Sequence, residues 1–141
     1  MDKEVQTDDL VKKIFDDGKA CFVPRFAKND MSMVKLKDYQ DFLNLPRNNK
    51  YGIRQPDSNE KRDEAFDTGG LDLILTPGVA FTKYGCRLGH GKGYYDGYLT
   101  KYTHKFLHQR PYVLGLAFKE QILDFVPTGD NDFLLDEVTS N

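Results

Sequence analysis

Apolar residues occur in short runs along the chain, and two of these runs predict strands of a parallel sheet. Residues 71–75 are mostly leucine and isoleucine and lie between a Gly-Gly and a Pro-Gly dipeptide. A short apolar run punctuated at both ends is typical of an interior strand. Residues 112–118 form a second, nearly continuous apolar run, and residues 94–102 between them have a helical pattern. The centre of the chain therefore predicts a strand, a helix and another strand.

The first part of the chain predicts a further set of alternating elements. Thr7 is a suitable N-cap, Gly18 can end the helix, and the apolar residues between them share one face. Pro24 is expected to stop the apolar run that follows. The predicted elements are a helix at 7–18, strands at 20–23 and 31–36, and a short helix at 38–43. A helix that leads into a strand implies an earlier strand, so the pattern indicates an α/β unit that lacks its first strand.

Polar segments connect these elements. Residues 46–68 form a long polar stretch, and loops of this length are usually functional or disordered, so we expect it to act as a lid. Residues 103–110 read as a polar connection and residues 119–125 as a short helix. The acidic residues at 130–137, taken alone, are typical of a solvated chain end.

Composition limits the class of protein. A chain of 141 residues corresponds to one domain, spanning residues 1–141, with 30% charged and 39% apolar residues. A formal net charge of −2 argues against general binding to nucleic acid or anionic membrane. The chain shows neither a membrane-span-length apolar run nor a signal-peptide pattern, and its two cysteines favour a reducing compartment, so we expect a cytoplasmic protein.

The segment between the first central strand and its helix carries the candidate chemistry. Arg87 precedes three glycines at alternate positions, 89, 91 and 93, with Lys92 among them. Glycines allow backbone N–H groups to approach a phosphate, and the following helix N-terminus favours an anion. Asp96, one turn into the helix, could bind magnesium. The spacing matches neither the Walker A loop nor the dinucleotide fingerprint, so a structural turn and a phosphate site stay equal alternatives on the residues alone.

The string RLGHGKGYYDGYL closely resembles the signature of the 5-formyltetrahydrofolate cyclo-ligase (methenyltetrahydrofolate synthetase) family. The upstream DLILTPGVAFTKYGCRLG and the downstream PYVLGLAFKEQI, ND and DEV segments resemble that family in order and spacing, from Glu4 to about Val138. The family carries a further N-terminal segment of several dozen residues that this chain lacks. The resemblance implies a three-layer α/β sandwich with a mainly parallel, Rossmann-like sheet, here expected to lack an N-terminal strand and helix.

The resemblance also implies a reaction. Members of the family convert 5-formyltetrahydrofolate to 5,10-methenyltetrahydrofolate with ATP and Mg²⁺ and release ADP and phosphate. A non-catalytic folate-binding fragment or isoform is the alternative. The implied partner is a small-molecule folate, with neither nucleic acid nor membrane, and the chain is expected to be a monomer.

The family's functional positions map onto this chain by the matching motifs. The implied catalytic residues are Arg87 and Lys92. The implied ATP-binding residues are Arg87, Leu88, Gly89, His90, Gly91, Lys92, Gly93, Tyr94 and Tyr95. The implied folate-binding residues are Glu4, Phe26, Tyr51, His90, Gly91, Lys92, Gly93 and Tyr94. Asp96 and Asp132 are the implied magnesium ligands.

Overall fold

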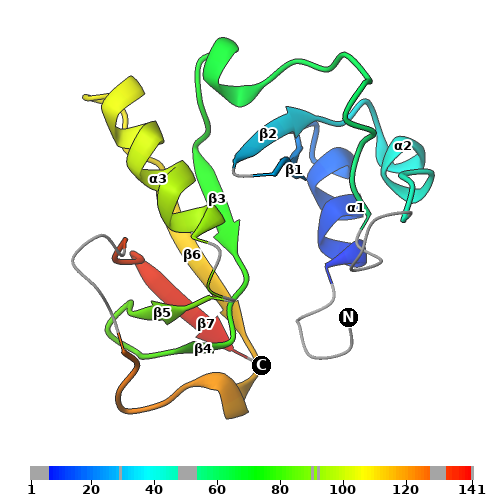
Figure 1. Cartoon of the computed structure of the whole chain (residues 1–141). Coiled ribbons are helices and arrows are strands. Elements are labelled where there is room, and N and C mark those ends of the chain that lie inside the picture. Colours follow the sequence, from blue (N-terminus) through cyan, green and yellow to red (C-terminus); the bar gives the residue numbers. More distant parts are fainter. Residues whose placement is uncertain are drawn as a thin grey trace. The chain divides into compact units, whose positions relative to one another are not determined.

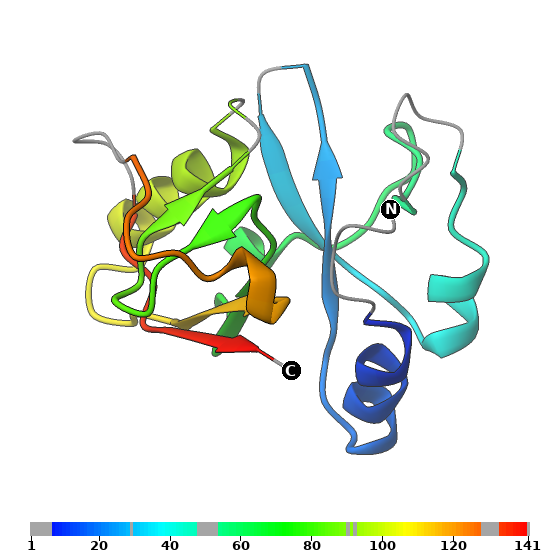
Figure 2. The same cartoon turned by 90° about the horizontal axis from the view of Figure 1, so that it is seen from below.

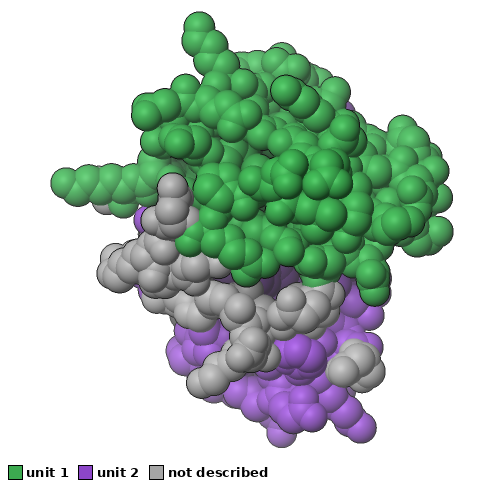
Figure 3. All heavy atoms as spheres, turned by 90° about the vertical axis from the view of Figure 1, so that its right-hand side faces the viewer, with its two compact units in different colours: residues 1, 6–70 green, residues 2–5, 71–141 purple. Residues whose placement is uncertain are grey.

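The computed structural model describes residues 7–28, 30–47, 54–89, 91, 93–127 and 133–140. These residues fall into two compact units, one within residues 7–70 and the other within residues 71–140 (Figure 3). The prediction of a single domain over residues 1–141 stays a prediction. Among the described residues no helix is long and apolar enough to cross a membrane.

The first unit contains a two-stranded antiparallel ribbon and two helices (Figure 1). Its elements are α1 (Asp8–Asp16), β1 (Phe22–Phe26), β2 (Met31–Lys35), α2 (Tyr39–Leu43) and the 3₁₀ turn η1 (Ala65–Asp67). Val34 and Leu36 are almost completely buried and form its core together with Val11, Val23, Phe42 and Leu45. The predicted helices and the predicted second strand are confirmed within one or two residues.

Local chemistry explains where these helices begin and end. Asp38 caps α2, because its carboxylate accepts the N–H of Asp41 at 2.8 Å. Gly18 ends α1 with a φ of +74°, and the N–H groups of Gly18 and Lys19 return to the carbonyls of Phe15 and Ile14. Thr7 occupies the N-cap position of α1, but its side chain makes no capping hydrogen bond.

The prediction that Pro24 stops the first strand is wrong. β1 runs through Pro24, which pairs with Met33 in the ribbon. Proline lacks an N–H donor but can occupy a strand position at which that donor is not needed, as in an edge strand. In the described ribbon β1 pairs with β2 alone, so the missing donor breaks no ladder on its other side.

The second unit is built on a three-stranded parallel sheet with the order β3-β6-β7. Its strands are β3 (Leu73–Thr76), β6 (Tyr112–Ala117) and β7 (Glu137–Ser140), and α3 (Tyr94–Lys105) connects the first two and lies beside the sheet (Figures 1 and 2). This arrangement confirms the α/β class with parallel strands. It also confirms the strand–helix–strand prediction, although α3 extends three residues further into the predicted polar connection.

A buried tyrosine fixes the start of β3 to the helix. The hydroxyl of Tyr102, which is fully buried, accepts the N–H of Leu71 and donates to its carbonyl at 2.9 Å. A single side chain thereby satisfies both backbone groups of Leu71 just before the strand begins. The orientation of α3 over the sheet is set partly by this contact.

Two predictions for the second unit are wrong. β3 lies at the edge of the described sheet, with Leu73 50% exposed, so it is not an interior strand there. Residues 119–125 form only the 3₁₀ turn η2 (Lys119–Gln121), because Ile122 returns to an extended conformation. The acidic chain end contains β7, which pairs with β6 from Glu137 onward, while Asp136 and Glu137 are exposed, as expected of a solvated chain end.

Candidate functional site

The segment between β3 and α3 forms a short hairpin before the glycine loop. β4 (Ala80–Phe81) and β5 (Arg87–Leu88) pair antiparallel, and Leu123 donates its N–H to the carbonyl of Phe81 at 2.7 Å. The turn between the strands contains Gly85, with a φ of +97°. This hairpin, which the sequence pattern did not predict, returns the chain to the carboxyl end of β3.

Arg87 is held there as a buried cation. It is 8% exposed, and its Nε donates to the carbonyl of Pro77, the first residue after β3. Its guanidinium lies over the ring of Tyr95, with 5.1 Å between Cζ and the ring centroid. Oδ2 of the Asp96 carboxylate lies 3.7 Å from Nη1 of Arg87. The structure therefore brings together three of the predicted site residues, Arg87, Tyr95 and Asp96.

The glycines of the loop differ in backbone conformation and in the space available for a side chain. A Cβ on Gly89 would lie 3.2 Å from both terminal guanidinium nitrogens of Arg87, so a side chain there would press on the cation. Gly91 has a φ of +91° and open space around the position of a Cβ. Gly93 is the left-handed N-cap of α3 and offers no side-chain acceptor to the first-turn N–H groups. The loop thus combines close backbone approach with the positive end of a 12-residue helix.

Asp96 is engaged on both oxygens. Oδ1 accepts the N–H of Phe133 at 3.1 Å, and Oδ2 makes the contact with Arg87. A carboxylate has about four acceptor sites, so these two contacts leave coordination capacity. Among the described residues no group of three or more His, Cys, Asp or Glu side chains is arranged to hold a metal.

The remaining predicted residues are distributed as follows. Leu88 lies in β5, where its carbonyl accepts the N–H of Val79 at 2.7 Å, and Tyr94 begins α3. Phe26 ends β1 in the first unit, where its N–H donates to Oε1 of Gln55 at 3.2 Å. Five predicted residues lie outside the described part of the chain: Glu4, Tyr51, His90, Lys92 and Asp132.

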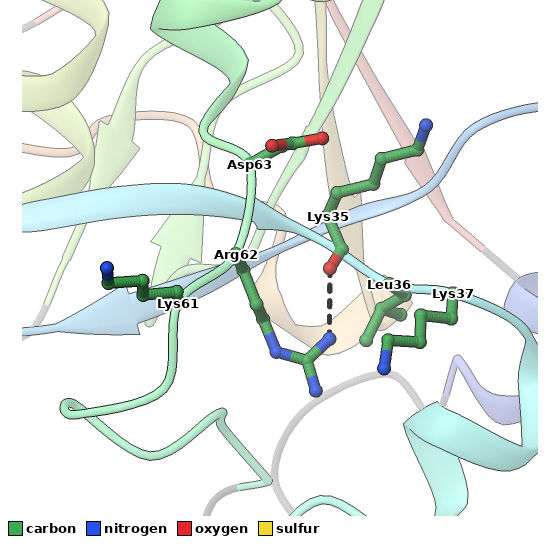
Figure 4. A pocket seen from close by; sticks show the side chains of 6 residues that line it. All are labelled: Lys35, Leu36, Lys37, Lys61, Arg62 and Asp63. Atoms are coloured by element: carbon green, nitrogen blue, oxygen red, sulfur yellow. Dashed lines mark hydrogen bonds between the residues drawn. The ribbon is translucent and has the colours of Figure 1, made fainter.

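A pocket in the first unit contains none of the predicted site residues. It is lined by Lys35, Leu36, Lys37, Lys61, Arg62 and Asp63 (Figure 4). Arg62 is bound to both oxygens of Asp41 at 2.7 and 2.8 Å and to Glu60 at 2.9 Å. The ammonium groups of Lys35 and Lys61 extend away from the guanidinium in different directions (Figure 4). The charges of Lys35 and Lys61 therefore do not converge on that of Arg62 (Figure 4). Asp41 and Glu60 offset the Arg62 charge.

Sequence reasoning missed the backbone contacts of this site. The carbonyl of Pro77 and the N–H of Phe133 hold Arg87 and Asp96. Every residue type has a backbone carbonyl and all except proline have a backbone N–H, so the residue types do not indicate these contacts. Gln121, whose side chain binds the loop after β3, was also not identified. An amide after a predicted strand is a weak signal, because its partners come from a segment 42 or 43 residues away.

The parallel sheet and the loop that follows its first strand define an α/β protein with a candidate anion site at the carboxyl end of β3. The model of the 5-formyltetrahydrofolate cyclo-ligase family matches residues 1–141. The 5-formyltetrahydrofolate cyclo-ligase of Mus musculus is 46% identical over 142 residues, which cover 98% of this chain and 68% of the mouse protein. The chain therefore belongs to the 5-formyltetrahydrofolate cyclo-ligase family, a family of ligases.

Other relatives agree with this assignment. A probable 5-formyltetrahydrofolate cyclo-ligase of Caenorhabditis elegans is 45% identical over 137 residues, which cover 96% of this chain and 66% of the worm protein. The NMR structure of Aquifex aeolicus 5,10-methenyltetrahydrofolate synthetase is similar with a TM-score of 0.66 and 26% identity, covering 97% of this chain and 62% of that one. A Mycoplasma pneumoniae synthetase at 22% identity and a TM-score of 0.63 shares the fold. The chain spans about two thirds of the length of these relatives.

Proposed function

We propose that this chain converts 5-formyltetrahydrofolate to 5,10-methenyltetrahydrofolate in a reaction that consumes ATP and requires Mg²⁺. Family membership supports the reaction, and the buried Arg87 beside the glycine loop supports the use of a phosphate donor. A guanidinium that is 8% exposed, fixed by a backbone carbonyl at the carboxyl end of a parallel strand, suits an anion more than it suits core packing.

The chemical problem in this reaction is a poor leaving group. The formyl oxygen of the substrate would take the γ-phosphoryl group of ATP, and ADP would leave. N10 of the folate would then attack the formyl carbon, the C–O bond would break with release of phosphate, and N10 would lose its proton. The protein needs to form no covalent bond in this scheme, so positioning and charge compensation are its main contributions.

Each part of the loop has a proposed role in that scheme. Arg87 and Lys92 would offset the charge of the transferred phosphoryl group, and the backbone of residues 88–95 would bind the phosphates. The predicted catalytic role of Arg87 agrees with its fixed orientation, since Pro77 and Tyr95 both restrict the guanidinium. His90 and Tyr94 would contact both ligands, as the family resemblance implies.

The folate contacts are proposed from the resemblance. Phe26 and Tyr51 would contact the flat pterin or benzoyl groups through their rings, and Glu4 would bind the pterin. Phe26 is half-buried at the end of β1, so part of its ring surface is accessible to a ligand.

Asp96 and Asp132 would hold magnesium, which when bound would supply positive charge against the phosphates. Two observations fit this role. Asp96 has carboxylate oxygens that can act as metal ligands beside the loop, and its side chain is 20% exposed. The N–H that it binds belongs to Phe133, the residue that directly follows Asp132 in the sequence.

The test is formation of the methenyl product, followed by its absorbance, when the pure chain meets 5-formyltetrahydrofolate. Four mixtures are compared, with and without ATP and with and without Mg²⁺. Product that needs both ATP and Mg²⁺ is the expected result. Absence of product under all four conditions would contradict the proposal. In that case calorimetry with the folate alone would decide for or against the alternative, a non-catalytic folate-binding protein.

A further inference from the structure

The side chain of Gln121 connects the carboxyl ends of the two neighbouring parallel strands β3 and β6. Gln121 lies at the end of η2, a few residues after β6. Its Oε1 accepts the N–H of Phe118 at 2.8 Å, and its Nε2 donates to the carbonyls of Gly78 and Val79 at 2.9 and 3.3 Å. An N–H can only donate and a carbonyl can only accept, so these partners fix the orientation of the amide.

The segment that Gln121 holds is the same segment that orients Arg87. The carbonyl of Pro77 accepts Nε–H of Arg87, and the N–H of Val79 donates to the carbonyl of Leu88 at 2.7 Å. Residues 77–79 therefore have β5 as partner on one side and Gln121 on the other.

This segment has no space in which to move toward the hairpin. A Cβ on Gly78 would lie 2.8 Å from the ring of Phe81 and 3.2 Å from the carbonyl oxygen of Leu88. The backbone is thus packed against β4 and β5, and the side chain of Gln121 in η2 binds it from the other side. A change at Gln121 is expected to reach Arg87 through this short, close-packed backbone.

We propose that Gln121 is a positioning residue for the anion site. It sets the carbonyl of Pro77, which in turn fixes the guanidinium of Arg87 at the glycine loop. The inference rests on the proposed function where it concerns ATP. Its structural part, the dependence of the Arg87 orientation on Gln121, concerns the protein without ligand.

The informative variant is Gln121→Glu, which is nearly isosteric. A carboxylate can still accept the N–H of Phe118, but it cannot donate to Gly78 or Val79 and it repels their carbonyl oxygens. Gln40→Glu is the matched control. Gln40 is exposed in α2, where its amide donates to Oδ1 of Asn44 at 3.3 Å, and the substitution changes the net charge equally.

The first measurement is hydrogen exchange at Nε of Arg87, followed by ¹⁵N NMR in the protein without ligand. The hydrogen bond to Pro77 should protect this group in the wild type and in Gln40→Glu. We expect exchange at least about fivefold faster in Gln121→Glu, with the amide signals of α3 unchanged. Equal protection in both variants would overturn the positioning role, whatever the activity of the chain.

The second measurement is the steady-state kinetics of the same proteins. Loss of the Gln121 donor should raise the KM for ATP about tenfold, while the KM for the folate changes less than about twofold. A general loss of structure would instead alter both constants and the thermal midpoint. Unchanged KM for ATP in an active Gln121→Glu protein would refute the proposal. Lack of ATP dependence in the wild type would refute the proposed function and leave the exchange result to decide on the positioning role.

Discussion

The paired charges of Asp41 and Arg62 lead to a prediction about stability and pH. Replacing Asp41 by asparagine should lower the free energy of unfolding at neutral pH by about 1 to 2 kcal/mol, and this loss should disappear in acid. The two terminal nitrogens of Arg62 bind the two carboxylate oxygens at 2.7 and 2.8 Å, and the N–H of Lys37 donates to the same carboxylate at 2.8 Å. Only 6% of the Arg62 side chain and 16% of the Asp41 side chain are exposed.

The magnitude follows from the pKa of Asp41. Hydrogen bonds from Arg62 lower this pKa from 3.8 to about 2, against the opposing effect of burial. The difference corresponds to roughly 2 kcal/mol, which is an upper value because part of the carboxylate remains in contact with water. A carboxyl group whose pKa is lower in the folded protein stabilises that protein at pH values above the unfolded pKa. This stabilisation is lost as the pH falls through the folded pKa. About half of the contribution should remain at about pH 3, between these two values.

The assay is urea unfolding of the wild type and Asp41→Asn, followed by circular dichroism from pH 7 down to pH 3. Other carboxylates also titrate in this range, so the quantity of interest is the difference between the two proteins at each pH. Asp16→Asn is the control, because Asp16 pairs with Lys12 on the surface with 62% of its side chain exposed. A difference that stays constant from pH 7 to pH 3, or an equal loss in Asp16→Asn, would refute the reasoning.

Three further predictions concern other parts of the chain. Gly85→Ala should lower the free energy of unfolding by more than about 3 kcal/mol in chemical unfolding, because its Cβ would lie 2.3 Å from the carbonyl oxygen of Leu135. Gly69→Ala is the control. Gly69 has the same φ of +97° but open space around the Cβ position, so this substitution should cost only about 1 to 2 kcal/mol. Tyr102→Phe should lower the free energy of unfolding by about 1 to 3 kcal/mol, since both backbone groups of Leu71 would lose their hydrogen-bond partner. Tyr84, which is 71% exposed, supplies the control, because Tyr84→Phe should leave the stability unchanged. Lys92→Ala should lower turnover more than folate affinity, and near-normal turnover would contradict its proposed role.

The sequence allowed prediction of the elements whose side chains follow a clear period. β3, α3 and β6 were found because apolar runs and a helical pattern mark them. β4 and β5 have two residues each, too few for any period, and form through backbone pairing with each other. β7 reads as a polar chain end, since its residues are mostly exposed and the strand is defined by its pairing with β6.

The same distinction applies to the candidate site. Residue types identified Arg87 and Asp96, because a cation among glycines and an acid in the first turn of a helix carry a chemical meaning by themselves. Their mutual arrangement was not predictable. It depends on the hairpin, on the carbonyl of Pro77 and on the N–H of Phe133, and these backbone features cannot be recognised from the residue types.

The contact between Arg87 and Asp96 gives this arrangement a consequence for ligand binding. At 3.7 Å the guanidinium and the carboxylate attract each other without a short hydrogen bond, so each can exchange the other for a more highly charged partner. A polyphosphate that approached Arg87 would repel Asp96, and a divalent cation near Asp96 would remove that repulsion. Under the proposed function, the polyphosphate and the divalent cation should therefore bind with positive cooperativity, because each ligand would neutralise the charge that opposes the other. The same pair would keep the buried guanidinium compensated when neither ligand is bound.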